Sequence, residues 1–263
     1  MLQSTDTMHA VERIITQTVS DKAAVLVAFD VDMTLTVPSH PALYYPNMYK
    51  HKIVLDSLLQ PLQAAEKDRV TSFCIQRYGY ALIEKETPAV VRAIQAQSIK
   101  TMAFTALLTG RLGDLEDAEV LRCRKLRALG FNFSQAFSHS PFVLEDVAIY
   151  NGYYPLYHQG VLYANGEGGT HNKGTVLVNF LQKVDYLPQM FIMVDDKTEN
   201  LLAIQHALAA WHTSIQFVGI HYTGAQAYAP EAIPEATFRA FWQEAMAYLR
   251  AYGPYDPYQR NRP

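Results

Sequence analysis

The chain of 263 residues is 49% hydrophobic and 18% charged, and its net charge is −3. This length and hydrophobic fraction allow a sizeable buried core and exclude a mostly disordered protein. The small net charge gives no reason to expect a nucleic acid or an anionic membrane as a partner. Two cysteines, Cys74 and Cys123, are too few for a disulfide framework and are expected to be buried or half-buried thiols.

The start of the chain shows no targeting segment. Residues 1–20 lack the basic start and the long apolar run of a secretory signal peptide, and no stretch approaches the roughly 18 apolar residues of a membrane span. We therefore expect a cytoplasmic protein with no membrane partner. The sequence leaves open export without a signal peptide, and it leaves open the oligomeric state.

The first third of the chain predicts a helix, a strand and an insertion. Apolar residues at helical spacing predict a helix over 8–18, and the β-branched apolar run at 23–29 predicts a strand buried on both faces. Residues 38–86 interrupt this pattern, because they begin with Pro38 and Pro41, are rich in tyrosine and have mostly helical spacing. We expect them to form a mainly helical insertion after the first core strand.

From residue 87 onward, strands and helices alternate. In chain order we expect a helix over 87–98, a strand over 100–110, a helix over 114–130, a weaker strand at 134–137, a hairpin at 150–168, a helix over 173–184, a strand over 190–196, a helix over 199–211, a strand over 214–222 and a last helix over 234–250 that packs on the sheet. This alternation predicts an α/β fold with a doubly wound parallel sheet. Residues 1–37 and 87–250 would form that core, and 251–263 a flexible tail.

Carboxylates follow two of the predicted strands. Asp30 and Asp32 come directly after the first strand, and Asp195 and Asp196 end another, a few residues before Asn200. Because parallel strands bring their carboxyl ends to one edge of a sheet, these groups should meet there. Like charges at that spacing need a shared proton or a cation, and oxygen ligands favour Mg²⁺ over zinc or copper. Each pair taken alone is also explained as an ordinary turn or helix cap.

Three further residues suit the binding of a phosphate group. Thr109 and Gly110 end the apolar run at 100–110, where a hydroxyl and a bare N–H can hold a phosphate oxygen, although a simple turn is the commoner explanation. Lys173 begins a helix, which is unfavourable for a cation in the helix dipole. It is either a positioned charge or an exposed lysine.

In combination, these motifs resemble those of the haloacid dehalogenase-like (HAD) hydrolase superfamily, phosphatase type. The resemblance is carried by FDVDMTLT at 29–36, by Thr109-Gly110, by Lys173 and by VDDKTEN at 194–200, and it covers roughly 20–37 and 87–222. It implies a Rossmann-like core with residues 38–86 as a helical cap. The segment from VLYANGEGG to HNKGTVL also resembles a little-studied bacterial branch of this superfamily.

The resemblance implies a Mg²⁺-dependent phosphatase. Asp30 would be the nucleophile that forms an aspartyl-phosphate, and Asp32 would give a proton to the leaving oxygen and later take one from water. Thr109 and the Gly110 N–H would hold the phosphoryl oxygens, and Lys173 would neutralise charge on Asp30 and the phosphate.

The same resemblance implies a ligand set for the metal. Mg²⁺ would be held by the Asp30 carboxylate, the Asp32 backbone carbonyl and Asp196, and Asp195 would be a second or outer ligand. Counting four residues back from Asn200 makes Asp196 the direct ligand. The acid two residues after the nucleophile is typical of phosphatases and phosphomutases, so dehalogenation is not expected.

The substrate class stays open at the level of sequence. A phosphorylated small molecule and a phosphoprotein both fit, and Arg111 is a candidate for the substrate anion or for an ordinary salt bridge. The insertion offers further candidate contacts, namely Tyr44, Tyr45, Tyr49, Lys50, His51, Lys52, Arg77 and Tyr78. Two alternatives remain: a phosphotransferase or phosphomutase of the same fold, and a binding protein that has kept the fold without turnover.

Overall fold

The computed structural model describes residues 1–19, 21–137, 141–228 and 232–254, and the chain divides into two compact units. The first comprises Met1–Val37, Leu82–Thr109 and Arg122–Ala229, and the second comprises Pro38–Ala81, Gly110–Leu121 and Pro230–Pro263. In the described part of the chain, no helix has both the length and the low polarity needed to cross a membrane.

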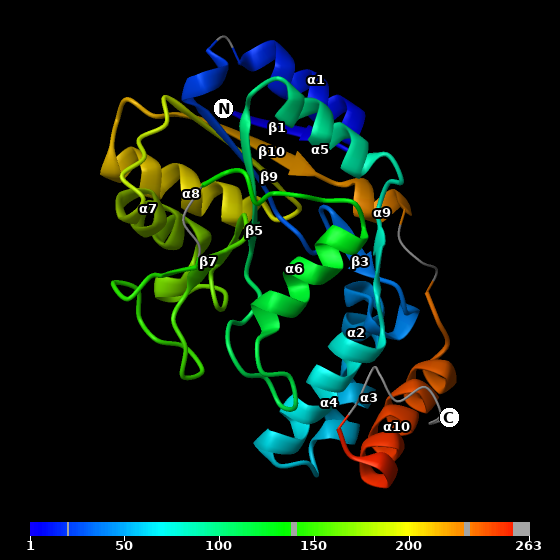
Figure 1. The fold of residues 1–263 in the computed structure, drawn as a ribbon. Helices are drawn as coiled ribbons and strands as arrows, with labels where there is room; N and C mark the ends of the chain where they lie inside the picture. The colour runs from blue at the N-terminus through cyan, green and yellow to red at the C-terminus, as the bar shows by residue number, and fades with distance from the viewer. Residues whose placement is uncertain (20, 138–140, 229–231, 255–263) are drawn as a thin grey trace. The chain divides into compact units, whose positions relative to one another are not determined.

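The first unit is built on a mostly parallel sheet (Figure 1). Its strand order is β1-β10-β9-β2-β5-β8-β7-β6, in which β6 and β7 run antiparallel to their neighbours. The strands span Leu2–Thr5 (β1), Val25–Phe29 (β2), Lys100–Thr105 (β5), Phe142–Val143 (β6), Leu156–His158 (β7), Val161–Tyr163 (β8), Met190–Asp195 (β9) and Gln216–Tyr222 (β10). The predicted α/β class is therefore confirmed at this coarse level.

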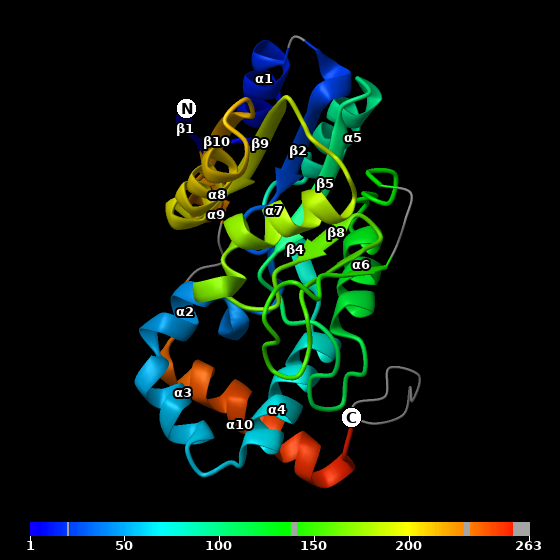
Figure 2. The same cartoon turned by 90° about the vertical axis from the view of Figure 1, so that its left-hand side faces the viewer.

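Helices cover both faces of this sheet. Helices α7 (Lys173–Lys183) and α8 (Thr198–Trp211) lie on one face, and α1 (Met8–Thr18) and α5 (Thr87–Ala96) lie on the other (Figure 2). Every residue of β2 is buried, which explains why the strand is apolar throughout. Helix α6 (Ala118–Ala128) begins in the second unit and continues into the first, and the short α9 (Gly224–Tyr228) belongs to the first.

The second unit is helical and contains α2 (Tyr45–Lys50), α3 (Lys52–Leu59), α4 (Ala64–Arg77) and α10 (Glu235–Tyr252). The chain passes between the units at β3 (Thr36–Pro38) and β4 (Tyr80–Leu82), which pair with each other. The insertion is thus mainly helical, as its spacing predicts.

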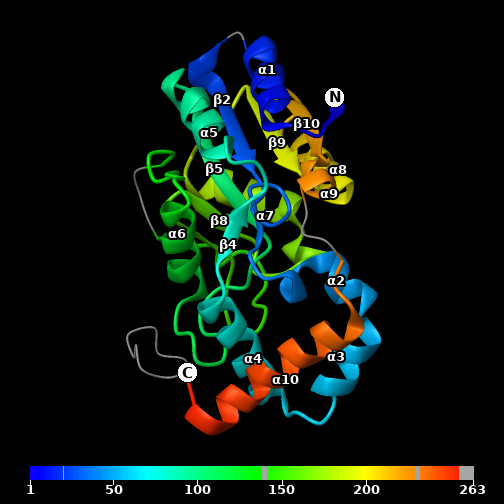
Figure 3. The same ribbon diagram turned by 90° about the vertical axis from the view of Figure 1, so that its right-hand side faces the viewer.

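The last helix corrects one expectation. We expected α10 to pack on the sheet, but it lies beside α3 and α4 (Figure 3). Its buried Phe238, Phe241 and Trp242 share one core with Val70 and Phe73 of α4. Helix α10 also includes the first two residues of the expected tail, and residues 255–263 of that tail lie outside the described part.

Smaller differences concern weak local patterns. Residues 134–137 form a turn and a bend instead of a strand, because four residues are too few to establish a period. The hairpin expected at 150–168 is confirmed as β7 and β8, and β1 was not predicted.

Candidate active site

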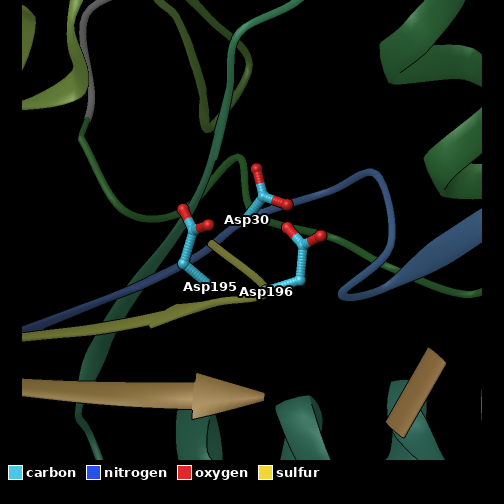
Figure 4. Close-up of side chains that lie close together, drawn as sticks. All are labelled: Asp30, Asp195 and Asp196. Carbon is cyan, nitrogen blue, oxygen red and sulfur yellow. The ribbon is translucent and has the colours of Figure 1, made fainter. Parts of the chain in front are cut away.

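Three carboxylates meet at the carboxyl ends of two neighbouring strands. Phe29 of β2 pairs with Val194 of β9, which places Asp30 and Asp195 level with each other, and Asp196 follows. The Asp30 N–H donates to the Val194 carbonyl at 2.8 Å. One carboxylate oxygen of each acid lies within 4.8 Å of the others (Figure 4), so the structure brings Asp30, Asp195 and Asp196 together.

Lys173 bridges two of these acids. Its Nζ lies 2.5 Å from Asp30 Oδ1 and 2.7 Å from Asp195 Oδ2, and the side chain is only 2% exposed. It is the first residue of α7, whose N-terminus is capped by Asn172 accepting from the Thr175 N–H at 3.0 Å. The alternative of an exposed lysine is therefore wrong, because the ammonium is a buried and positioned charge.

Glycine lets α7 approach α8 closely enough to place that lysine. A Cβ on Gly174 would lie 2.2 Å from the Ala203 carbonyl oxygen of α8. That separation is too short for any side chain at this position. The residue after Lys173 must therefore be glycine at this helix spacing.

The cluster holds more negative than positive charge. Burial raises the pKa of Asp30 well above its ordinary value; Lys173 opposes that rise and the two other acids add to it. Burial, and then the charge of Asp195, raises the pKa of Asp196 to about 7. Burial alone would lower the pKa of Lys173, but Asp195 and Asp30 outweigh it and the pKa is raised. Three acids around one ammonium form a site suited to a further cation.

Asp195 and Asp196 have different surroundings. Asp195 is fully buried and accepts from the Lys197 N–H at 2.9 Å and from Asn200 Nδ2 at 3.0 and 3.1 Å, in addition to Lys173. Asp196 is half-buried and can be reached from solvent. Asp195 is thus held by protein donors, whereas Asp196 is better placed to bind a ligand.

Asp32 does not join this cluster through its carboxylate. It forms a bidentate ion pair with Arg122 of α6, at 2.9 Å from Nη1 to Oδ1 and 3.2 Å from Nη2 to Oδ2. The Arg122 side chain is 4% exposed and that of Asp32 is 20% exposed. Sequence reasoning missed Arg122. The available signal was its place one turn before Leu126 and beside Cys123, both of which are buried.

The turn that carries Asp32 is tight and unusual. The N–H groups of Leu35 and Thr36 both donate to the Val31 carbonyl, at 3.0 and 2.9 Å, and Met33 has a φ of 68°. A non-glycine residue in that region is strained by about 1 kcal/mol, and such strain is commonly found at functional sites. Thr34 is fully buried, and its hydroxyl has no hydrogen-bond partner among the residues that the structure describes.

Thr109 is anchored within the first unit. Its N–H donates to Asn165 Oδ1 at 3.0 Å and its hydroxyl donates to the Tyr154 carbonyl at 2.8 Å. Strand β5 ends earlier, at the buried Thr105, which lies two residues beyond the Phe29–Ala103 pair and so reaches the same edge as Asp30. Sequence reasoning missed Thr105 because the apolar run continues beyond the strand's end.

Gly110 and Arg111 belong to the second unit. The Gly110 N–H donates to Glu119 Oε2 at 2.8 Å, and Arg111 is exposed with its Nε donating to the Gly113 carbonyl at 3.3 Å. The N–H expected to hold a phosphate oxygen therefore already has an anionic acceptor. The binding roles of Gly110, Arg111 and Thr109 stay predictions.

Several uncharacterized proteins of the bacterial genus Rickettsia are similar to this chain. An uncharacterized protein of Rickettsia bellii is 24% identical over 148 residues, which cover 56% of this chain and 49% of that protein. One of Rickettsia felis is 23% identical over 195 residues, covering 73% and 59%. One of Rickettsia conorii is 24% identical over 147 residues, covering 55% and 48%. The chain thus spans about half the length of these curated relatives.

No solved structure matches this chain. A family profile described as "Protein of unknown function (DUF2608)" matches residues 4–251, which is nearly the whole chain. The chain therefore belongs to the DUF2608 family.

Proposed function

We propose that the chain is a Mg²⁺-dependent phosphatase that hydrolyses a phosphate monoester through an aspartyl-phosphate on Asp30. The observation that carries this proposal is the convergence of Asp30, Asp195 and Asp196 around the buried ammonium of Lys173. A nucleophilic carboxylate, an excess of negative charge and a fixed cation are the groups that phosphoryl transfer uses. The resemblance to the HAD superfamily agrees with these roles.

The residues present fit Mg²⁺. It binds hard oxygen ligands at about 2.1 Å, so opposite ligands lie about 4.2 Å apart. One carboxylate oxygen from each of the three acids lies within 4.8 Å of the others, close to that span. Asp30, Asp196 and the Asp32 backbone carbonyl would hold the ion, and Asp195 would support it from the outer shell. When bound, the ion neutralises charge on the phosphoryl oxygens and the carboxylates.

The chain's own residues account for both chemical steps. An oxygen of Asp30 attacks phosphorus while the bond to the leaving oxygen breaks, and Asp32 gives that oxygen a proton. Water then attacks phosphorus and gives its proton to Asp32. The bond between phosphorus and Asp30 breaks and inorganic phosphate leaves. Lys173 fixes one oxygen of Asp30 throughout, so the nucleophile does not rotate away.

The remaining assignments concern the substrate. In this proposal Thr109, Gly110 and Arg111 contact the phosphoryl group or a neighbouring anion, and the mainly helical insertion of residues 38–86 is the cap. The substrate is a phosphorylated small molecule or a phosphoprotein. A cap excludes water and contacts the leaving group, so it would determine which of the two classes is accepted.

The test is hydrolysis of para-nitrophenyl phosphate by the wild type with Mg²⁺, the wild type with EDTA, and the Asp30→Asn variant with Mg²⁺. We expect turnover only in the first case. Asp185→Asn is a matched control, because that carboxylate is exposed in the turn between α7 and β9, at the opposite ends of these elements from Lys173 and Asp195. It should keep full activity.

Two results would contradict the proposal. Turnover that survives Asp30→Asn would show that Asp30 is not the nucleophile. A wild type that neither turns over a panel of phosphate esters nor gains thermal stability with Mg²⁺ would favour a binding protein. Product analysis without an added acceptor distinguishes the phosphotransferase alternative, because a phosphatase releases one inorganic phosphate for each ester cleaved, whereas a phosphotransferase needs an acceptor other than water.

A further inference from the structure

We propose that Arg122 is a positioning residue that holds Asp32 in the orientation needed to protonate the leaving group. This inference rests on the proposed phosphatase function and assigns a role to a residue that the motifs do not include. It comes from the bidentate ion pair between Arg122 and Asp32, in which both carboxylate oxygens are engaged.

The geometry of the pair is that of a rigid clamp. Arginine presents two parallel N–H donors in a plane, and this two-point contact fixes both the position and the rotation of a carboxylate. The distances of 2.9 and 3.2 Å show that both donors are used. Each oxygen of Asp32 keeps a second lone pair, so the clamp leaves the carboxylate able to exchange a proton.

The two members of the ion pair differ in burial. Arg122 is 4% exposed while Asp32 is 20% exposed, so the guanidinium belongs to the interior and the carboxylate faces partly outward. If Asp32 rotated away, a buried guanidinium would lose this anion, which is strongly unfavourable. The backbone adds a second restraint, because Asp32 precedes Met33, whose φ of 68° marks a tight turn. Asp32 is therefore held from both its side chain and its backbone.

The consequence for the reaction concerns the leaving group. A poor leaving group departs only when its oxygen is protonated, whereas a good one, such as para-nitrophenolate, departs without much help. A misplacement of about 1 Å can lower a rate by about 100-fold. Loosening Asp32 should therefore harm poor leaving groups much more than good ones, whereas a general loss of structure would harm both alike.

The experiment measures kcat/KM with Mg²⁺ for substituted phenyl phosphates, from para-nitrophenyl to unsubstituted phenyl phosphate. This quantity reports the step in which the leaving group departs. The first variant is Arg122→Lys, which keeps the buried positive charge but not the two-point contact. Arg122→Gln is the second variant. Arg124→Gln is the matched control, because Arg124 lies on the same helix and is exposed.

We expect Arg122→Lys and Arg122→Gln to lower kcat/KM for phenyl phosphate at least about tenfold more than for para-nitrophenyl phosphate. This tenfold difference is a part of the roughly 10²- to 10⁴-fold increase in rate that general acid catalysis contributes. The control should follow the wild type across the series. Equal losses for all esters would overturn the proposal. A variant that discriminates less than the wild type would also overturn it, since the guanidinium would then hinder proton donation.

A double-mutant cycle separates a positioning role from an independent one. In the Asp32→Asn background, Arg122→Lys should change kcat/KM for phenyl phosphate by less than about twofold, because the group that it positions no longer acts. Losses that multiply would overturn the proposal. The failure of the proposed function looks different: the wild type would show no Mg²⁺-dependent turnover of any ester, and the present inference would fall with it.

Discussion

Replacing Asp196 with asparagine should stabilise the metal-free protein at pH 8. Folding raises the pKa of Asp196 from 3.8 to about 7, so the folded state keeps a proton that the unfolded chain releases in this interval. The free energy of unfolding therefore falls as the pH rises from about 4 to about 7. One pKa unit corresponds to about 1.4 kcal/mol, so the ionised carboxylate destabilises the fold by about 4 kcal/mol at pH 8. Asparagine has almost the same shape and lacks that charge.

Thermal unfolding in EDTA measures this effect. A gain of about 4 kcal/mol raises the Tm of a chain of this size by about 8–16 °C. At pH 5 the gain should fall below half, because wild-type Asp196 is then mostly protonated. Mg²⁺ at pH 8 should raise the Tm of the wild type and not that of the variant, which lacks a ligand. Asp185→Asn, at an exposed position with a φ of 49° that asparagine tolerates, should change the Tm little under any of these conditions.

The result that would refute this reasoning is equally specific. If Asp196→Asn leaves the Tm unchanged or lowers it at pH 8 in EDTA, the three carboxylates do not repel one another in the metal-free fold. If the variant still gains stability from Mg²⁺ as the wild type does, the ion binds without Asp196. The first outcome would mean that repulsion between the carboxylates does not favour a bound cation. The second would mean that Asp196 is not a metal ligand.

Three further predictions concern the same region. Lys173→Met should lower the free energy of unfolding in EDTA by about 3–5 kcal/mol in urea denaturation, because it leaves buried acids without their cation, and a loss below about 1 kcal/mol would contradict this. Gly174→Ala should lower the free energy of unfolding by about 1–3 kcal/mol and weaken stabilisation by Mg²⁺, because its Cβ meets the Ala203 carbonyl. Gly79→Ala is the control, because its Cβ makes an ordinary contact. Equal losses of unfolding free energy in the two variants would refute the explanation. Thr34→Val should keep or raise the Tm because the buried hydroxyl has no partner in the described part of the chain, whereas a Tm loss above about 4 °C would show that it has one.

The central strands could be predicted because burial on both faces requires a continuous apolar run. The runs at 23–29 and 190–196 became β2 (Val25–Phe29) and β9 (Met190–Asp195). The ends of such runs also locate the residues that follow them, so the sequence predicts that Asp30 and Asp195 lie close together, and the structure confirms it. Here a local pattern carries long-range information, because parallel strands share an edge.

Where a helix packs could not be predicted in the same way. The apolar face of α10 indicates that this face is buried, but it does not identify what covers it. Phe238 and Trp242 would suit the sheet as well as they suit α4, where Val70 and Phe73 receive them. An amphipathic pattern is a property of one helix, whereas a packing partner is a property of two segments that lie more than 150 residues apart in this chain.

Arg122 shows the same limit inside the candidate site. Helix α6 contains several basic residues, and such a run indicates a solvated face unless one member is known to be buried. The ion pair joins residues 90 positions apart, so no spacing rule connects them. The pattern did contain a hint, because a cation one turn before the buried Leu126 lies where an apolar residue is expected. A cation at such a position needs an anion, and Asp32 supplies it.

Asn165 has a buried role that its local turn pattern does not predict. Its neighbour Gly166 and its φ of 55° are those of an ordinary turn, which is what an Asn-Gly pair predicts. Yet the side chain is fully buried, accepts from the Thr109 N–H and donates to the carbonyls of Tyr150 and Tyr153, at 2.9 and 2.7 Å. A residue chosen only for its turn would leave that amide in solvent. Because three backbone groups bond to its buried side chain, the same asparagine forms the turn and holds Thr109 in place.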